Sequence, residues 1–455
     1  MSSTAECKPW KRVRNIYSAL YWATGIDGAV RCFQSLHSVG LGALAFGLIS
    51  GASHADWPEF RGPSQNGTAS VASLPTEWSA EPGQEKNIVW QTPTEGLGWS
   101  SPVIVGDRIY ITSARPDASD DGKPTGAQSL ILSIYNVETG ALIAHRTLFQ
   151  QPVDAPDIHK KNSHASPTLV AHEGRLYVHF GHQGTACTDL EGNILWSNRN
   201  HTYPPVHGNG GSPIVVGDRL IVTCDGGEAP YTLALDVATG NEVWKTPRRI
   251  QCDRPFSFAT PQWIEVDGRA QIISPGSDIV QSLDPATGKI LWTVSYSGFS
   301  VVPRPIFHRG LVFVCTGYMA PKLLAIDPTG VGDVTDTHVR WTFSAGVPNT
   351  PSLVPVDDQI VMVSDGGVAT GIRADDGKKL WQKRLGGNYS ASPFALRNRV
   401  YFQSESGEAI VMEVSESATE IARTSLPGRV FASYAVQAND LIIRTEDRLV
   451  RIGSR

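Results

Sequence analysis

The stretch "SPIVVGDRLIVT" at Ser212–Thr223 decides the fold, because a near copy, "SPVIVGDRIYIT", stands at Ser101–Thr112. Each copy holds two runs of β-prone residues separated by Gly-Asp. Glycine supplies the positive φ that a two-residue hairpin turn needs, so the pattern predicts a hairpin. A second half follows at Thr232–Trp244, "TLALDVATGNEVW", with a turn at Asp236–Gly240 between two further strands. One unit is therefore four antiparallel strands.

This unit recurs along the chain at intervals of roughly 40–48 residues, a period typical of propeller blades. The expected first strands start near Ser101, Ser166, Ser212, Thr260, Arg304, Pro351, Ser392 and Ser433. The second half ends on a tryptophan at Trp196, Trp244, Trp292, Trp341 and Trp381. A residue that returns at one place in successive units is architectural, and we expect these rings to wedge between neighbouring blades.

The eighth unit has three strands before the chain ends, whereas "NIVWQT" at Asn87–Thr92 is a last strand without a unit of its own. Pairing these two segments closes the ring and removes exposed strand edges. We therefore predict an all-β, eight-bladed β-propeller over residues 87–455, closed by an N-terminal strand. Residues 56–86 are assigned to an N-terminal extension, and no period of 3.6 residues indicates a helical solenoid.

Residues 1–55 are expected to be a signal peptide or leader. They combine early basic residues with the apolar, small-residue stretch Ser38–Ala55, and Ser53-His54-Ala55 resembles a cleavage site. A retained membrane anchor is the alternative, although the apolar part is short for a spanning helix. After cleavage four cysteines remain, Cys187, Cys224, Cys252 and Cys315, which allow three disulfide pairings or none. The formal net charge of −5 and the absence of a Lys/Arg cluster beyond residue 56 argue against a nucleic-acid partner.

The half-repeat Ala234–Trp244 resembles the tryptophan-docking motif of quinoprotein (PQQ-like) dehydrogenase propellers. The same motif occurs in the outer-membrane assembly scaffold BamB, which has the fold without the cofactor. The segments Trp57–Ser70, Leu74–Ser79, Gly332–Trp341 and Gly386–Pro393 are similar to a secreted PQQ-like propeller family of planctomycete-type bacteria. The resemblance implies an exported propeller of the periplasm or cell envelope.

The enzyme branch of this resemblance implies PQQ stacked on a tryptophan, Ca²⁺ held by Glu, Asn and Asp, and in the alcohol type a pair of adjacent cysteines. This sequence has no Cys-Cys pair and no C-x-x-C-H haem attachment. Because a fold does not carry a function by itself, we expect a cofactor-free, non-enzymatic binding or scaffold protein. The alternative is a PQQ- and calcium-dependent oxidoreductase of alcohols or sugars.

Binding residues are expected in the loops that precede the first strand and follow the second strand of each unit, since these loops meet around the central funnel. The candidates are Trp99, His159, Lys160, His164, His207, Asn209, Asp225, Arg254, Arg304, Tyr318, Asn349, Asp365, Tyr389, Glu405, Phe431 and Glu446. The expected ligand is a segment of an envelope protein or a polysaccharide, and the chain is expected to be a monomer without a membrane span once the leader is removed.

Several candidates also have an alternative interpretation in which their role is structural. Asp225 and Asp365 are each followed by Gly-Gly in corresponding units, which favours a turn role. Arg254 and Arg304 are alternatively partners of neighbouring carboxylates. The histidines around residues 159–207 have no metal-ligand spacing, so no metal site is predicted. A serine hydrolase lacks support, because no Gly-x-Ser-x-Gly elbow stands at a strand-to-helix turn.

Overall fold

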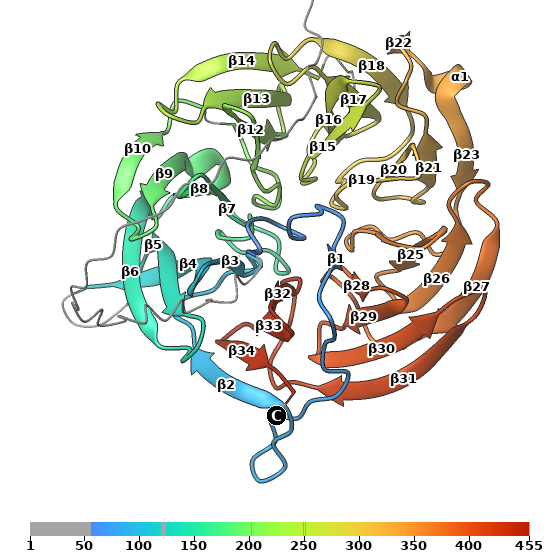
Figure 1. Ribbon diagram of the computed structural model, residues 1–455. Coiled ribbons are helices and arrows are strands. Elements are labelled where there is room, and N and C mark those ends of the chain that lie inside the picture. Colours follow the sequence, from blue (N-terminus) through green and yellow to red (C-terminus); the bar gives the residue numbers. More distant parts are fainter. Residues whose placement is uncertain (1–55, 120–123, 202, 249, 251, 455) are drawn as a thin grey trace, which may run out of the picture. The chain divides into compact units, whose positions relative to one another are not determined.

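The computed structural model describes residues 56–119, 124–201, 203–248, 250 and 252–454. The predicted leader lies outside the described residues, so the structure does not test it. Eight sheets, each with four antiparallel strands, surround one axis (Figure 1). The predicted eight-bladed β-propeller is confirmed. Within the described residues, the helices are limited to α1 (Thr335–His338) and the 3-10 turn η1 (Gly181–Gln183).

We number the blades along the chain and give their strands from the axis outward. Blade 1 contains β3 (Val103–Val105), β4 (Arg108–Ala118), β5 (Pro124–Asn136) and β6 (Leu142–Gln151). Blade 2 contains β7 (Val170–His172), β8 (Arg175–His179), β9 (Thr185–Asp189) and β10 (Ile194–Asn198). Blade 3 contains β11 (Ile214–Val216), β12 (Arg219–Cys224), β13 (Tyr231–Asp236) and β14 (Glu242–Pro247). Blade 4 contains β15 (Gln262–Val266), β16 (Arg269–Gly276), β17 (Ile279–Leu283) and β18 (Ile290–Ser295), with β22 (Gly332–Asp333) added outside.

The second half of the ring repeats this order. Blade 5 contains β19 (Ile306–His308), β20 (Leu311–Cys315), β21 (Leu323–Ile326) and β23 (Val339–Phe343). Blade 6 contains β24 (Val354–Val356), β25 (Gln359–Val363), β26 (Val368–Arg373) and β27 (Lys379–Arg384). Blade 7 contains β28 (Phe394–Leu396), β29 (Arg399–Gln403), β30 (Glu408–Val414) and β31 (Ala418–Ser425), with β1 (Thr68–Ala69) added on the inside. Blade 8 contains β32 (Ala435–Gln437), β33 (Asp440–Arg444), β34 (Arg448–Ile452) and β2 (Ile88–Pro93).

Blade 8 joins the two ends of the described chain. Strand β2 pairs antiparallel with β34, placing Ile88 opposite Ile452 and Pro93 opposite Arg448. The predicted closure by an N-terminal strand is therefore confirmed. The first strands also begin where the repeats place them, except in blade 6, where Ser352 and not Pro351 holds the position of Ser101, and in blade 2. There Thr168, not Ser166, corresponds to Ser101 and Ser212, because β7 begins only at Val170.

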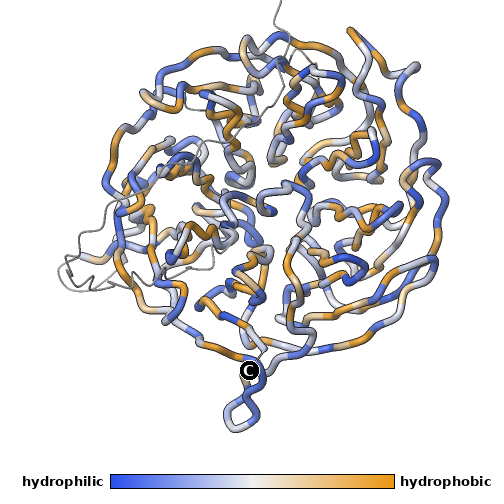
Figure 2. Tube along the Cα trace, in the orientation of Figure 1, coloured by the Kyte–Doolittle hydropathy of each residue, from blue (hydrophilic) through white to orange (hydrophobic). Residues whose placement is uncertain are grey.

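The hydrophobic core is divided among the contacts between blades. One cluster, for example, joins Trp244 of blade 3 to Ile272 and Leu283 of blade 4. Hydrophobic residues are accordingly spread through every blade and are not gathered at one centre (Figure 2). Each blade buries its faces against its two neighbours, so the ring is stable only as a closed set.

Tryptophans link the outer strand of one blade to the last turn of the next. Trp196 donates its Nε1–H to the carbonyl oxygen of Val237 at 3.0 Å, and its ring lies on Gly240. Trp90, Trp244 and Trp341 repeat this arrangement at the other junctions of the same type. The turn itself is held by Asp236, whose carboxylate accepts from the backbone N–H of Ala238 and of Thr239.

Two predicted tryptophans reach the next blade through a glutamine. Trp292 donates to Gln271 Oε1, and Gln271 Nε2 donates to the carbonyl oxygen of Pro328 in blade 5. Trp381 uses Gln359 in the same way toward Ser415 in blade 7. The turns of blades 5 and 7 lack the Asp-x-x-x-Gly form. At these two junctions the glutamine side chain bridges the tryptophan of one blade to a carbonyl oxygen in the turn of the next blade.

We expect Gly240→Ala to lower the free energy of unfolding by about 2 kcal/mol more than Gly217→Ala, as measured by urea denaturation. Both glycines have positive φ, +73° and +58°, so both substitutions carry the left-handed penalty of about 1–2 kcal/mol. A Cβ at Gly240 would also lie 2.4 Å from the Trp196 ring, whereas at Gly217 nothing lies within 4 Å. Overpacking of this kind costs typically 1–3 kcal/mol. Equal effects of the two substitutions would contradict the docking role of Trp196.

Candidate functional site

A chain of hydrogen bonds encircles the axis where the first strands begin. At seven of the eight ring positions the backbone N–H donates to the side-chain hydroxyl of the next blade at 2.9–3.0 Å. The hydroxyls, hereafter the hydroxyl ring, belong to Ser101, Thr168, Ser212, Thr260, Ser352, Ser392 and Ser433. All of these residues are buried. The ring therefore fixes the blades against one another at the axis.

Arg304 occupies the ring position of blade 5 and has no hydroxyl to offer. Its Nε donates to the carbonyl oxygen of Pro261 at 3.2 Å, which bridges blade 5 to blade 4. Its other nitrogens reach the N-terminal extension, at the carbonyl oxygen of Phe60 (2.6 Å) and at Glu59 Oε2 (3.0 Å). The interruption of the ring is thus the place where the extension is anchored.

The N-terminal extension crosses the axis and closes it (Figure 1). Trp57 pairs with Ile104 of blade 1, and β1 pairs in parallel with β28 of blade 7. Between them, Arg61 is buried and donates to the carbonyl oxygens of Pro393 and Leu353. We call Trp57–Ala69 the plug, because it fills the axis that the inner strands surround.

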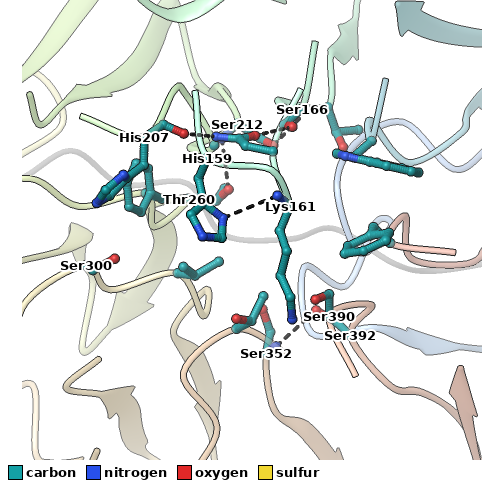
Figure 3. Close-up of a pocket in the computed structure, with 18 of the residues that line it drawn as sticks. His159, Lys161, Ser166, His207, Ser212, Thr260, Ser300, Ser352, Ser390 and Ser392 are labelled. Carbon is teal, nitrogen blue, oxygen red and sulfur yellow. Dashed lines mark hydrogen bonds between the residues drawn. The ribbon is translucent and has the colours of Figure 1, made fainter. Parts of the chain in front are cut away.

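A cavity of about 410 Å³ adjoins the hydroxyl ring, with Phe60 and all seven ring hydroxyls in its lining, whereas Arg61 and Arg304 are not part of that lining. The walls are aromatic, and comprise Trp99, His159, His207, Phe256, Phe258, Phe299, Tyr318 and Phe431. The rings contact one another: His207 meets Phe256 edge-on at 5.3 Å, and Trp99 lies 4.5 Å from Phe431 between centroids. Figure 3 shows ring hydroxyls and Lys161 facing the same space. The volume suits a small ligand or a few side chains.

Charge at the cavity wall is paired. Lys161 Nζ lies 2.8 Å from Glu405 Oε1, and Ser390 donates to the same oxygen at 2.6 Å. Among the described residues, the cavity lining includes no Asp or Glu. The pKa of His159 is lowered by burial and by the nearby His207 and lysines. Cations line the rim, where Arg254 stacks on Phe299 at 4.5 Å and Arg429 on Trp99 at 5.6 Å.

Five of the candidates from the sequence line this cavity: Trp99, His159, His207, Tyr318 and Phe431. Glu405 reaches it through Lys161 and Ser390, and Arg254 backs its wall through Phe299. Of the adjacent lysines Lys160 and Lys161, Lys160 was the predicted binding residue, whereas Lys161 is the one that lines the cavity.

Other candidates have their side chains engaged elsewhere and are not part of the described cavity lining. Arg304 anchors the plug, and Tyr389 is fully buried. Asp225 forms a buried pair with Arg248 at 2.6 Å, beyond the turn role considered for it.

The remaining candidates stabilise loops around the cavity. Asn209 accepts from the hydroxyl of Tyr203, and Asp365 accepts the backbone N–H of Asn349. His164 lies beside Gln151, and Glu446 pairs with Arg429. None of these residues belongs to the described lining.

The sequence reasoning did not select Phe60, Phe256, Phe299 or the hydroxyl ring. Phe256 stands in a loop that the sequence places at the funnel, but phenylalanine between turn residues is equally typical of core. Phe60 belongs to the N-terminal extension, which the sequence did not place at the funnel. The ring had a signal, because a serine or threonine opens almost every unit. That repetition indicates a shared structural position and does not by itself reveal that the hydroxyls meet.

The four cysteines left open by the sequence are unpaired thiols in the structure. Within the described residues, no three His, Cys, Asp or Glu side chains gather as metal ligands do. No helix in this part of the chain is long and apolar enough to cross a bilayer.

The family model described as outer membrane protein assembly factor BamB matches residues 84–254 and 276–420. Among solved structures, BamB from Moraxella catarrhalis is 16% identical, with a TM-score of 0.57, covering 81% of this chain and 97% of that one. A quinohemoprotein alcohol dehydrogenase from Comamonas testosteroni is 10% identical, with a TM-score of 0.61, covering 88% and 80%. A europium-containing methanol dehydrogenase is 11% identical, with a TM-score of 0.60, covering 86% and 90%. No curated protein matches.

The residues do not fit the calcium-bound quinone that the dehydrogenase branch implies. Calcium prefers several oxygen ligands, carboxylates among them, and the described lining provides hydroxyls and aromatic rings without a carboxylate. Glu405, which adjoins the cavity, is already held by Lys161 and Ser390. Since the BamB model covers well over half of the sequence, the chain belongs to the PQQ-like β-propeller family described as outer membrane protein assembly factor BamB.

Proposed function

We propose that this protein is an exported, non-enzymatic binding propeller of the cell envelope that holds a segment of a partner protein in its central cavity. The observation that carries the proposal is the cavity itself. It is closed below by Phe60, walled by aromatic rings, and framed by hydroxyl groups. Apolar walls with a few convergent polar groups are typical of binding sites. Membership of the BamB family supports a protein partner in the envelope.

Backbone strain supports a binding role for the same place. His207 and Ser300 line the cavity with φ of +66° and +55°, and Met319 and Ala320, beside Tyr318, have φ of +76° and +114°. Non-glycine residues in this region are costly, and such strain clusters at ligand sites. Met319 is also 76% exposed, so this loop presents a flexible apolar side chain next to an aromatic one.

The polar groups of the cavity are not arranged for nucleophilic catalysis. An activated serine or threonine needs a base within hydrogen-bonding reach. In the described cavity, the ring hydroxyls accept backbone N–H groups, and His159 Nδ1 accepts the backbone N–H of Lys161. The arrangement therefore favours binding over hydrolysis.

We expect Tyr318→Ala to weaken peptide binding about tenfold, whereas Trp263→Ala leaves it unchanged. Tyr318 and Trp263 are comparably exposed, 45% and 39%, but only Tyr318 belongs to the cavity lining. Loss of an aromatic anchor typically costs more than 1 kcal/mol of binding energy. The probes are peptides selected on the purified protein from a random library displayed with free C-termini. Their affinities for the protein and both variants are measured by calorimetry.

Three results would contradict the proposal. Selected peptides that bind both variants as tightly as the unaltered protein would place the partner elsewhere. Saturable binding of PQQ that depends on Ca²⁺, in place of peptide binding, would favour the oxidoreductase alternative. Binding of neutral oligosaccharides alone, lost in Tyr318→Ala, would replace the protein segment with a glycan.

A further inference from the structure

The hydroxyl ring presents unused donors to the cavity. Each oxygen already accepts a backbone N–H from the preceding blade. Within the described residues, none of these seven hydroxyls donates to a protein acceptor, although all are buried and all line the cavity. A hydroxyl has one hydrogen to donate. Seven O–H groups thus converge on one space, where a group rich in acceptors would satisfy them.

Two buried arginines, Arg61 of the plug and Arg304 of blade 5, place positive charge at the axis, and the carboxylates of the described residues pair with only one of them. Arg61 and Arg304 are both buried, and Glu59 pairs only with Arg304. Arg61 contacts carbonyl oxygens alone, and its Nε has no partner. Burial and the charge of Arg304 lower the pKa of Arg61 to about 9, which still leaves it charged at neutral pH. Buried charge without a counter-ion is costly.

This charge lies next to the hydroxyl ring. Arg304 itself occupies the eighth ring position, and its backbone N–H donates to Ser352. The guanidinium of Arg61 donates to the carbonyl oxygens of Leu353 and Pro393, the residues that follow Ser352 and Ser392. An anion on the ring would therefore be stabilised by the O–H donors directly and by the charge of the two buried arginines that contact residues of the ring and their neighbours.

The shape of the cavity restricts how such an anion arrives. Phe60 and the plug close the axis, so a chain cannot pass through and has to end or turn at the ring. Above the ring the walls are aromatic and suit apolar side chains. Trp99 adds a buried Nε1–H without an acceptor in the described chain. A polypeptide end combines these features, because its carboxylate and last side chains arrive together.

We propose that the hydroxyl ring is a carboxylate-binding site, which receives the free C-terminus of the partner segment while its last side chains pack against the aromatic walls. This inference rests on the proposed function, since it specifies which part of a peptide enters the cavity. It assigns the plug a second role: beyond closing the axis, its Arg61, together with Arg304 of blade 5, makes the ring attractive to an anion.

The test compares each selected peptide in two forms, with a C-terminal acid and with a C-terminal amide, by calorimetry. We expect the acid to bind at least about tenfold more tightly, as hydrogen bonds to a charged group are worth roughly 1.5–3 kcal/mol. Thr168→Val and Thr260→Val keep side-chain volume and remove one ring hydroxyl each. In each variant the ratio of amide to acid dissociation constants should fall by about threefold or more.

The ratio separates carboxylate recognition from general damage, because a loosened cavity weakens both peptide forms equally. Thr350→Ala is the matched control: Thr350 lines the cavity but takes no part in the ring, so the ratio should remain unchanged. Equal binding of acid and amide, or an unchanged ratio in both valine variants, would overturn the inference while leaving the proposed function intact. An amide peptide ending in aspartate that binds like the acid would overturn the chain-end version. Absence of peptide binding altogether would reject the proposed function itself.

Discussion

Arg304→Met is expected to lower the free energy of unfolding by about 3–5 kcal/mol, the range for breaking a buried ion pair from one side. The substitution leaves Glu59 charged without its partner, and it removes the donors that satisfy the carbonyl oxygens of Phe60 and Pro261. Methionine keeps most of the aliphatic volume, so the loss reports on polar contacts and not on a cavity. Urea denaturation followed by tryptophan fluorescence measures the change.

Two comparisons make this measurement specific. Arg309→Met removes an ion pair of the same length, 3.0 Å to Asp375, but with both side chains about half exposed, so solvent screening should make its effect on the free energy of unfolding much smaller than that of Arg304→Met. Adding Glu59→Gln to Arg304→Met should recover part of the lost free energy of unfolding, because the double variant no longer has an unpaired carboxylate at position 59. If Arg304→Met costs no more than Arg309→Met, the plug is not anchored by this arginine.

Acidification from pH 6.5 to pH 4 is expected to destabilise the protein by about 3 kcal/mol through His179 alone. Burial, with a smaller contribution from the charge of His182, lowers the pKa of His179 from 6.5 to about 4. Between these pH values the imidazole of His179 is protonated in the unfolded chain but remains largely neutral in the native state. The free energy of unfolding therefore falls as the pH falls. Each unit of pKa shift corresponds to about 1.4 kcal/mol.

The variant His179→Leu isolates this contribution, since the other histidines titrate in both proteins. The difference in unfolding free energy between wild type and variant should shrink by about 3 kcal/mol from pH 6.5 to pH 4. Thr185→Val removes the hydrogen bond to His179 Nδ1 but keeps the buried ring, and should retain the wild-type pH dependence. Parallel curves for wild type and His179→Leu would show that the ring is not buried in the neutral form.

The fold was predictable because its signals are local. The Gly-Asp hairpin, the turn at Asp236–Gly240 and the tryptophan that ends most units lie within one blade. Even the closing strand was visible, as an unmatched piece at each end of the repeats. The misplaced start of blade 2 is instructive: "SPT" at Ser166–Thr168 resembles the Ser-Pro of other blades, but the hairpin length sets Thr168 as the ring position.

The site was predictable only in outline. Loop position pointed to Trp99, His159 and Tyr318, since loops between defined strands must surround the axis. The plug was not predictable, because Arg61 and Arg304 find their partners hundreds of residues away in the chain. An arginine in a loop gives no local sign that it will be buried, as its environment is decided by which segment crosses the axis.

The pairing of β2 with β34 also sets the order of events during biosynthesis. Strand β2 leaves the ribosome before any blade is complete, yet its partner is the last strand of the chain. Contacts between distant segments form slowly, because the entropy of the intervening loop must be overcome first. Until β34 is available, β2 has no strand to pair with, although its Trp90 can already contact Gly140 of blade 1. A chain truncated before β34 therefore cannot close the ring through β2.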